Sequence, residues 1–356
     1  MIDILRDILS YISGLYTLPW ILVGFFITIL IAKVIGREKI DIIMKKIGQI
    51  ILYFFIPVLV FRIFLNTDFR ENELGFAIVV SIIVFFMYLL AFVFSIYKAK
   101  TWSLRGSKKR LFIKTVLTNQ GRSSAFIGGA LLASPWKIEA AIYIALVGIA
   151  LFAVIPYILS YIHKKESKNK EVEHVEALPW FLKIYPWYLL FWVIAGVTLH
   201  TSTGITTKDF GHDIETLILF YSAITIPAAL YYVGAGIHPD DFKKSELKKL
   251  FGIDRSNKTG DHWDWVRSIF ILTAVITPIL TVIVFAPFFL SGFISNAWFA
   301  VIIINSSLPI TSTNMFLLPY GIDKKATAHS ITWTTIFCVP VVVLLIYLFT
   351  IFLGTN

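Results

Sequence analysis

Two polar stretches interrupt long apolar runs of this chain, one in each half, and they restrict its fold more than any other feature. The first is TNQGRSSAFIGG, residues 118–129, and the second is INSSLPITSTN, residues 304–314. Each has apolar residues on both sides for about the depth of a bilayer. Hydrocarbon offers no hydrogen-bond partner, so a broken or polar helix is tolerated there only around a cavity inside the protein. Two such interruptions in corresponding places indicate the binding site of a transporter.

The composition supports a membrane protein. The chain is 57% hydrophobic and only 15% charged, whereas soluble domains carry about 25% charged residues. Its long apolar runs predict an all-α polytopic protein and exclude the short alternating strands of a barrel. A single cysteine, Cys338, excludes a disulfide framework. We attribute the net charge of +10 to loops and expect no nucleic-acid partner.

Ten apolar spans are expected, five in each half. They cover about 15–36, 47–65, 73–97, 110–134, 138–162, 178–200, 213–237, 265–291, 296–320 and 326–353. Of the 32 Lys and Arg residues, 21 lie in the loops after odd-numbered spans, 4 lie in the even loops or near the termini, and 7 lie within the spans. Basic loops stay in the cytoplasm, so we expect a multi-pass protein of the plasma membrane with both termini outside.

The two halves show weak self-similarity. Five spans per half require any repeat to be inverted across the membrane. Pro57 and Pro227 follow isoleucine in spans 2 and 7, and the polar stretches fall in spans 4 and 9. We therefore expect a first repeat over 1–162, a short cytoplasmic linker over 163–177 and a second repeat over 178–356. Inverted repeats with interrupted helices in matching places are typical of secondary transporters.

Several segments resemble the auxin efflux carrier family, which includes plant PIN-type carriers and prokaryotic permeases. Residues 307–340, SLPITSTNMFLLPYGIDKKATAHSITWTTIFCVP, resemble the ninth and tenth spans of that family. The segments around Pro57 and Pro227 and the sequence GGALL at 128–132 also resemble it. The chain departs from the pattern in span 4, where the family's Pro-Asn is Arg122-Ser123.

The resemblance implies a fold similar to the bile-acid symporters and sodium/proton antiporters. In that fold ten transmembrane helices form a 5+5 inverted repeat, and broken helices 4 and 9 cross at the membrane centre. Spans 1, 2, 6 and 7 form a scaffold domain, and spans 3–5 and 8–10 form a transport domain. The resemblance further implies an elevator-type efflux carrier and a homodimer, and it matches Pro309 to the crossover proline of span 9.

The candidate site lies where spans 4 and 9 would unwind. Two half-helix N-termini there, each with about +0.5 of a charge, favour an anion and especially a carboxylate. The candidate substrate-binding residues are grouped around these breaks: Asn119, Arg122, Ser123, Ser124, Asn305, Ser307, Pro309, Thr311, Thr313 and Asn314. The candidate crossover residues permit unusual backbone angles or kinks: Gly121, Gly128, Gly129, Pro57 and Pro227.

Arg122 is the most informative of these residues, because an arginine in mid-membrane costs at least about 2.5–3.5 kcal/mol. Its guanidinium fork suits a carboxylate, which predicts substrate contact. Alternatively it neutralises the C-terminal ends of the broken helices, or it snorkels to the membrane surface. All three interpretations are open at the level of sequence.

The function expected from these features is secondary transport of a small organic anion, with no enzymatic activity and no cofactor or metal. No carboxylate lies deep in a span, and coupling to Na+ or H+ is open. An ion channel and a substrate-sensing receptor are alternatives. An intramembrane serine protease that pairs Ser123 with His329 is a more remote one.

The longest loop, residues 238–264, has two interpretations. Apolar and basic side chains alternate in it with the spacing of an amphipathic helix on anionic lipid. An ordinary solvated connector explains the same pattern.

Overall fold

A computed structural model of the chain describes residues 20–67, 71–123, 136–168, 180–235, 243–253, 260–311, 314, 317 and 320–353. These residues form helices and one isolated backbone bridge, and none of them lies in a strand. In this part of the chain, five helices are long and apolar enough to cross a membrane: Arg37–Leu65, Leu74–Thr101, His212–Tyr232, His262–Leu290 and Lys324–Leu353. The all-α class is confirmed, while the count of ten spans and the inverted repeat stay predictions.

The chain folds into two compact units. The first comprises Met1–Ile78, Ser124–Leu146 and Trp187–Ile237. Its helices are α2 (Trp20–Ile35), α3 (Arg37–Ile50), the π-helix η2 (Ile51–Phe55), α4 (Ile56–Leu65), most of α8 (Lys137–Ile149) and of α10 (Trp180–Thr203), the short 3-10 helix η4 (Thr207–Phe210), and α11 (His212–Ala235).

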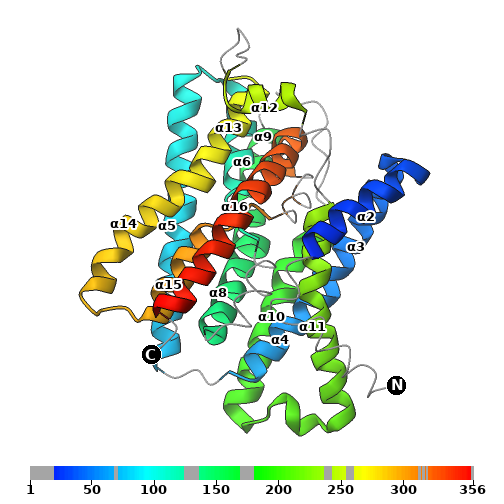
Figure 1. The fold of residues 1–356 in the computed structure, drawn as a ribbon, viewed down its shortest axis with the longest axis vertical. Helices are drawn as coiled ribbons and strands as arrows, with labels where there is room; N and C mark the ends of the chain where they lie inside the picture. Colours follow the sequence, from blue (N-terminus) through cyan, green and yellow to red (C-terminus); the bar gives the residue numbers. More distant parts are fainter. Residues whose placement is uncertain are drawn as a thin grey trace. The chain divides into compact units, whose positions relative to one another are not determined.

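The second unit comprises Val79–Ser123, Val147–Pro186 and His238–Asn356. It contains most of α5 (Glu71–Thr101), α6 (Gly106–Thr118), the π-helix η3 (Ala150–Val154), α9 (Ile155–Lys168), α12 (Lys244–Leu250), α13 (His262–Ile271), the π-helix η6 (Leu272–Ile276), α14 (Thr277–Leu290), α15 (Asn296–Ser306) and α16 (Lys324–Leu353). Figure 1 shows α13, η6 and α14 following one another as a single continuous rod. The linker expected over 163–177 begins as helix, because α9 continues to Lys168.

The first unit depends on close helix packing. Gly24 on α2 lies so close to α11 that a Cβ atom there would stand 2.1 Å from the carbonyl oxygen of Tyr231. Gly196 on α10 makes a similar approach, since its Cβ would lie 3.0 Å from the carbonyl oxygen of Phe61 on α4. A larger residue at position 24 forces two backbones apart, so that contact requires glycine, whereas at position 196 the neighbouring backbone would have to shift slightly.

The segment that follows the first span is helical, although its charge density is typical of a connector. The chain turns at Gly36, whose φ is 87°, and α3 begins at Arg37. Ile40 and Ile47 lie seven residues apart, which places them on one face of a helix. The Arg37 guanidinium donates a hydrogen bond to the carbonyl oxygen of Ala235 at 3.0 Å. In the sequence, the four basic residues of this segment make its apolar helical face difficult to recognise.

Within the described residues, three π-helical turns precede prolines at the same distance. η2, η3 and η6 each end two residues before a proline, namely Pro57, Pro156 and Pro278. In each case the residue before the proline donates its N–H five residues back, as Thr277 does to Leu272. A proline ring clashes with the carbonyl four residues earlier, and the wider π turn relieves that clash. The local cost is one or more carbonyls without a helical donor.

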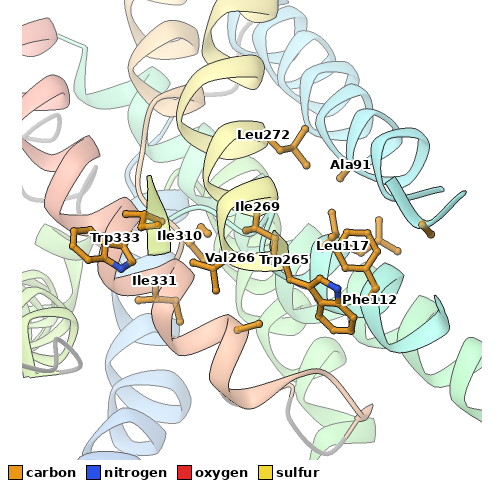
Figure 2. Close-up of a cluster of buried hydrophobic side chains, with 14 of the residues drawn as sticks. Ala91, Phe112, Leu117, Trp265, Val266, Ile269, Leu272, Ile310, Ile331 and Trp333 are labelled. Atoms are coloured by element: carbon orange, nitrogen blue, oxygen red, sulfur yellow. The ribbon is translucent and has the colours of Figure 1, made fainter. Parts of the chain in front are cut away.

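The core of the second unit surrounds the second polar stretch. Phe112 on α6 packs against Trp265 on α13 with ring centroids 5.0 Å apart. Figure 2 shows Ile310, which belongs to the polar stretch, beside Ile331 and Trp333 of α16. The chain around Ile310 is therefore inside the fold and is not a surface loop.

Candidate functional site

Both polar stretches begin where a helix of the second unit ends. Helix α6 ends at Thr118 and α15 ends at Ser306. Residues 119–123 and 307–311, which follow these ends, are irregular backbone, yet they are buried. Helix C-termini leave carbonyl groups without donors and carry partial negative charge. Two negative helix ends therefore approach the same buried region.

The two irregular segments pair with each other through the backbone. Arg122 and Ile310 form an isolated antiparallel bridge. Two hydrogen bonds flank it, from the Ser123 N–H to the Pro309 carbonyl at 2.9 Å and from the Thr311 N–H to the Gly121 carbonyl at 3.0 Å. The Ile310 N–H donates to the Thr334 hydroxyl of α16 at 3.2 Å. We call residues 119–123 and 307–311, joined in this way, the crossing.

Gly121 is required by the close contacts of the crossing. A Cβ atom on it would stand 2.5 Å from Cδ1 of Leu151 and 2.8 Å from the amide oxygen of Asn314. These contacts also locate Asn314 beside the first polar stretch. Any side chain at position 121 would displace one of these two neighbours.

Arg122 is buried, with 1% of its surface exposed. Its Nη1 atom donates to the carbonyl oxygen of Leu308 at 3.1 Å, and Nη2 donates to that of Thr273 at 3.0 Å. A guanidinium in this position does not snorkel, so the third interpretation of Arg122 is wrong. Both terminal nitrogens bind backbone of the second unit, as the counter-charge interpretation requires.

The local structure explains why these two carbonyls need Arg122. Leu308 follows the C-terminal end of α15, where carbonyls lack helical donors. In η6 the Thr277 N–H reaches back five residues to Leu272. The next pair in that register would join Thr273 to Pro278, which has no N–H. The guanidinium supplies the missing donor to both chain segments.

Two asparagines at the helix ends have the same local geometry. Nδ2 of Asn119 donates to the carbonyl four residues back at 2.8 Å, and Nδ2 of Asn305 does the same at 2.6 Å. A carbonyl can only accept, so these bonds determine which way each amide points. The Oδ1 atoms of Asn119 and Asn305 are buried and have no hydrogen-bond partner within the described residues.

Further polar groups near the helix ends are also buried. Gln120 donates to the Met87 carbonyl and the Thr277 hydroxyl, both at 3.3 Å, while its Oε1 has no partner among the described residues. Hydrogen-bond partners among the described residues are likewise missing for the side-chain oxygens of Thr118 and Ser123 and for both amide atoms of Asn314. Buried polar atoms without partners are costly in a native fold. This concentration of them indicates a place where a polar solute, ion or water binds.

The predicted site residues fall into three groups. The structure brings Gly121, Arg122, Ser123, Pro309 and Thr311 together at the crossing, with Asn119, Asn305, Ser307 and Asn314 at its edges. The Ser307 hydroxyl is already engaged, since it donates to the Ile303 carbonyl at 3.0 Å. Pro57 and Pro227 lie in the first unit. Ser124, Gly128, Gly129 and Thr313 lie outside the described residues.

Sequence analysis missed several contributors. Gln120 lies inside the first polar stretch, and an amide in an apolar span was the available signal. On α16, Thr327 accepts from Nδ2 of Asn119 at 3.2 Å, and Thr334 accepts from the backbone of the crossing. Thr327 and Thr334 lie seven residues apart, so a hydroxyl stripe on one helical face was visible in the sequence. The partner Thr273 could not have been found, because its carbonyl is freed by the π turn.

His329, which the protease alternative pairs with Ser123, lies beside two aromatic residues of α13. Its Nδ1 lies 2.9 Å from Nε2 of His262, and its ring stacks on Trp263 with centroids 5.0 Å apart. These contacts are made near the beginnings of α13 and α16. No group of three or more potential metal ligands (His, Cys, Asp or Glu) that could hold a metal ion occurs within the described residues.

Comparison with models of known protein families gives no match to this chain, and comparison with curated proteins gives none either. The resemblance to the auxin efflux carrier family therefore rests on the residues quoted above.

Proposed function

We propose that the chain is a secondary transporter of the auxin efflux carrier type that moves a small organic anion, preferably a carboxylate, across the plasma membrane. The observation that carries the proposal is the crossing itself. Helices α6 and α15 end in the buried interior, and the polar side chains beside these ends have hydrogen-bonding atoms that no described residue satisfies. Irregular backbone at membrane depth is tolerated only where it is enclosed by protein or lines a cavity.

The division into compact units supports alternating access. The crossing lies wholly within the second unit, and α2, α4 and α11 lie in the first. A movement of the second unit as one body would carry the site with it, which is the elevator mechanism. In this proposal spans 1, 2, 6 and 7 serve as the scaffold, the termini are extracytoplasmic, and the protein forms a homodimer.

The donors for a carboxylate are specific atoms. The Ser123 and Thr118 hydroxyls and Nδ2 of Asn314 can donate hydrogen bonds to it. The positive charge of Arg122 offsets the partial negative charge of the helix C-termini, which would otherwise repel an anion. The Oδ1 atoms of Asn119 and Asn305 only accept. A carboxylate gains nothing from these two oxygens, so they require a proton donor, a cation or water beside the substrate. The assay therefore compares currents with and without Na+ and H+ gradients to test for coupling to either ion.

The test is charge movement in proteoliposomes on a solid-supported membrane. The membrane is challenged with a panel of mono- and dicarboxylates, with and without Na+ and H+ gradients. The proposal predicts a saturable, carboxylate-dependent current. Ser123→Ala removes a hydrogen bond to a charged group worth about 1.5–3 kcal/mol, so the half-saturating concentration should rise roughly 10- to 150-fold.

Two controls make the assay decisive. Thr201→Ala removes an exposed hydroxyl of the first unit that bonds its own helix, and it should leave the current unchanged. Currents that do not saturate would favour an ion channel instead. Silence with every carboxylate under every gradient would refute the proposed substrate class.

A further inference from the structure

Residues 243–253 of the second unit form a basic surface element with two exposed apolar side chains; we call it the α12 segment. It contains helix α12 (Lys244–Leu250), four lysines and one glutamate. Phe251 and Ile253 directly follow the helix and are 71% and 74% exposed. Two large exposed apolar side chains next to a cluster of lysines form the combination that is typical of segments lying at a membrane surface.

The fold holds the α12 segment in a definite position. Leu250 is buried in the core cluster that contains Trp265. From α13, Nε of Arg267 donates to the Leu250 carbonyl at 2.9 Å, and Nη2 donates to the Lys249 carbonyl at 2.8 Å. Gly252 has a φ of 72°, which allows the chain to turn away at the helix end. Phe251 and Ile253 therefore point outward because of specific contacts.

The α12 segment lies at an end of the second unit where apolar helices begin and end. Figure 1 shows α12 beside the start of α13, and α13 opens the apolar helix His262–Leu290. At the same end Gly260 packs on Trp102, since its Cβ would lie 3.1 Å from that of Trp102. The Lys98 ammonium lies 5.7 Å from the centroid of the Trp102 ring. Tryptophan and lysine at span ends are typical of the headgroup region of a bilayer.

The exposed face of α12 has a definite order of chemical groups. Lys244, Lys248 and Phe251 are separated by four and then three residues, so they share one helical face. This face presents two ammonium groups followed by an aromatic side chain, and Ile253 comes next. The bias of basic residues toward one side of a membrane explains the lysines alone, but it does not explain the exposed apolar pair.

We propose that the α12 segment binds anionic phospholipids of the bilayer in which the protein is embedded. Lys244 and Lys248 pair with headgroup phosphates, while Phe251 and Ile253 insert at the boundary of the acyl chains. Charge complementarity selects this partner, because a positive surface at headgroup depth attracts acidic lipids by roughly tenfold in affinity for every one to two lysines. The inference needs only a membrane-embedded chain and does not depend on the proposed transport activity.

The test uses the full-length protein in nanodiscs. The variant Ile253→Cys is made in a Cys338→Ala background, which removes the single native cysteine, and it is labelled with an environment-sensitive fluorophore. Phosphatidylglycerol added to phosphatidylcholine should shift the emission to the blue, and brominated phosphatidylglycerol should quench it. Lys244→Gln combined with Lys248→Gln should raise the phosphatidylglycerol fraction needed for half the shift by roughly tenfold.

The control removes the same charge elsewhere. Lys108→Gln with Lys109→Gln changes two exposed lysines of α6 and should leave the lipid response intact. An equal loss in this control would mean that net charge alone acts, which overturns the proposal. Emission that is identical in the two lipid compositions overturns it too. A blue-shifted probe that brominated lipid never quenches would mean that protein, such as a second copy, covers the segment.

Discussion

Replacing Arg122 by methionine should destabilise the second unit strongly. Methionine keeps most of the volume but donates no hydrogen bond, so the carbonyls of Leu308 and Thr273 lose their guanidinium donor. A buried acceptor left without a partner costs about 1–3 kcal/mol, so the two carbonyls together predict a loss of about 2–6 kcal/mol. Arg122→Lys keeps the charge but has one nitrogen, which cannot reproduce the two-pronged contact, and should lose roughly half as much.

The loss is measured as the free energy of unfolding of the purified protein in detergent, followed by circular dichroism. Arg105→Met is the matched control. Arg105 is exposed just before α6, and its replacement should change the stability by less than about 0.5 kcal/mol. Unchanged stability of Arg122→Met together with lost carboxylate transport would refute the reasoning and favour substrate contact.

A double-mutant cycle tests the cause more narrowly. Pro278→Ala restores an N–H at the position that the π turn would pair with Thr273. Arg122→Met should therefore cost less in the Pro278→Ala background, with a coupling energy of about 1–3 kcal/mol. Strict additivity of the two changes, within about 0.5 kcal/mol, would show that the proline does not create the need for the arginine.

The first unit gives two further predictions. Gly24→Ala places a Cβ against the Tyr231 carbonyl, so it should lower the free energy of unfolding by about 1–3 kcal/mol; an unchanged midpoint of thermal unfolding would contradict the close helix contact. Tyr188→Phe removes the hydroxyl that donates to the Tyr53 carbonyl at 3.0 Å, which Pro57 leaves without its α-helical donor. Its cost, about 1–2 kcal/mol in the same assay, should diminish in a Pro57→Ala background.

The sequence was informative about class and about the place of the site. Long apolar runs predict an all-α protein, and the two polar stretches coincide with the ends of α6 and α15. The reason is that burying polar side chains in an apolar run is costly, and such side chains are tolerated where the helix is interrupted inside the protein. Arg122 was identified for the same reason, since a charged side chain inside an apolar run is costly and therefore indicates a functional or structural role.

The partners of those residues were not predictable from the sequence. The carbonyls that bind Arg122 come from Leu308 and Thr273, and Thr273 needs a donor only because Pro278 widens the helix before it. The prolines in apolar spans were visible, but the choice between a kink and a π turn depends on packing. Helix α3 was hidden because its basic residues resemble a connector. Gln120 was not identified, because the charge of Arg122, two residues away, is the stronger signal in the same stretch.

The most direct test of the account is a cryo-EM map of the full-length protein with the carboxylate that drives the largest current. The account predicts that the helices end at Thr118 and Ser306, that the backbone of Arg122 pairs with that of Ile310, and that ligand density lies beside Ser123 and Asn314. Helices that continue through residues 119–123 and 307–311, or ligand density only in another part of the protein, would contradict it.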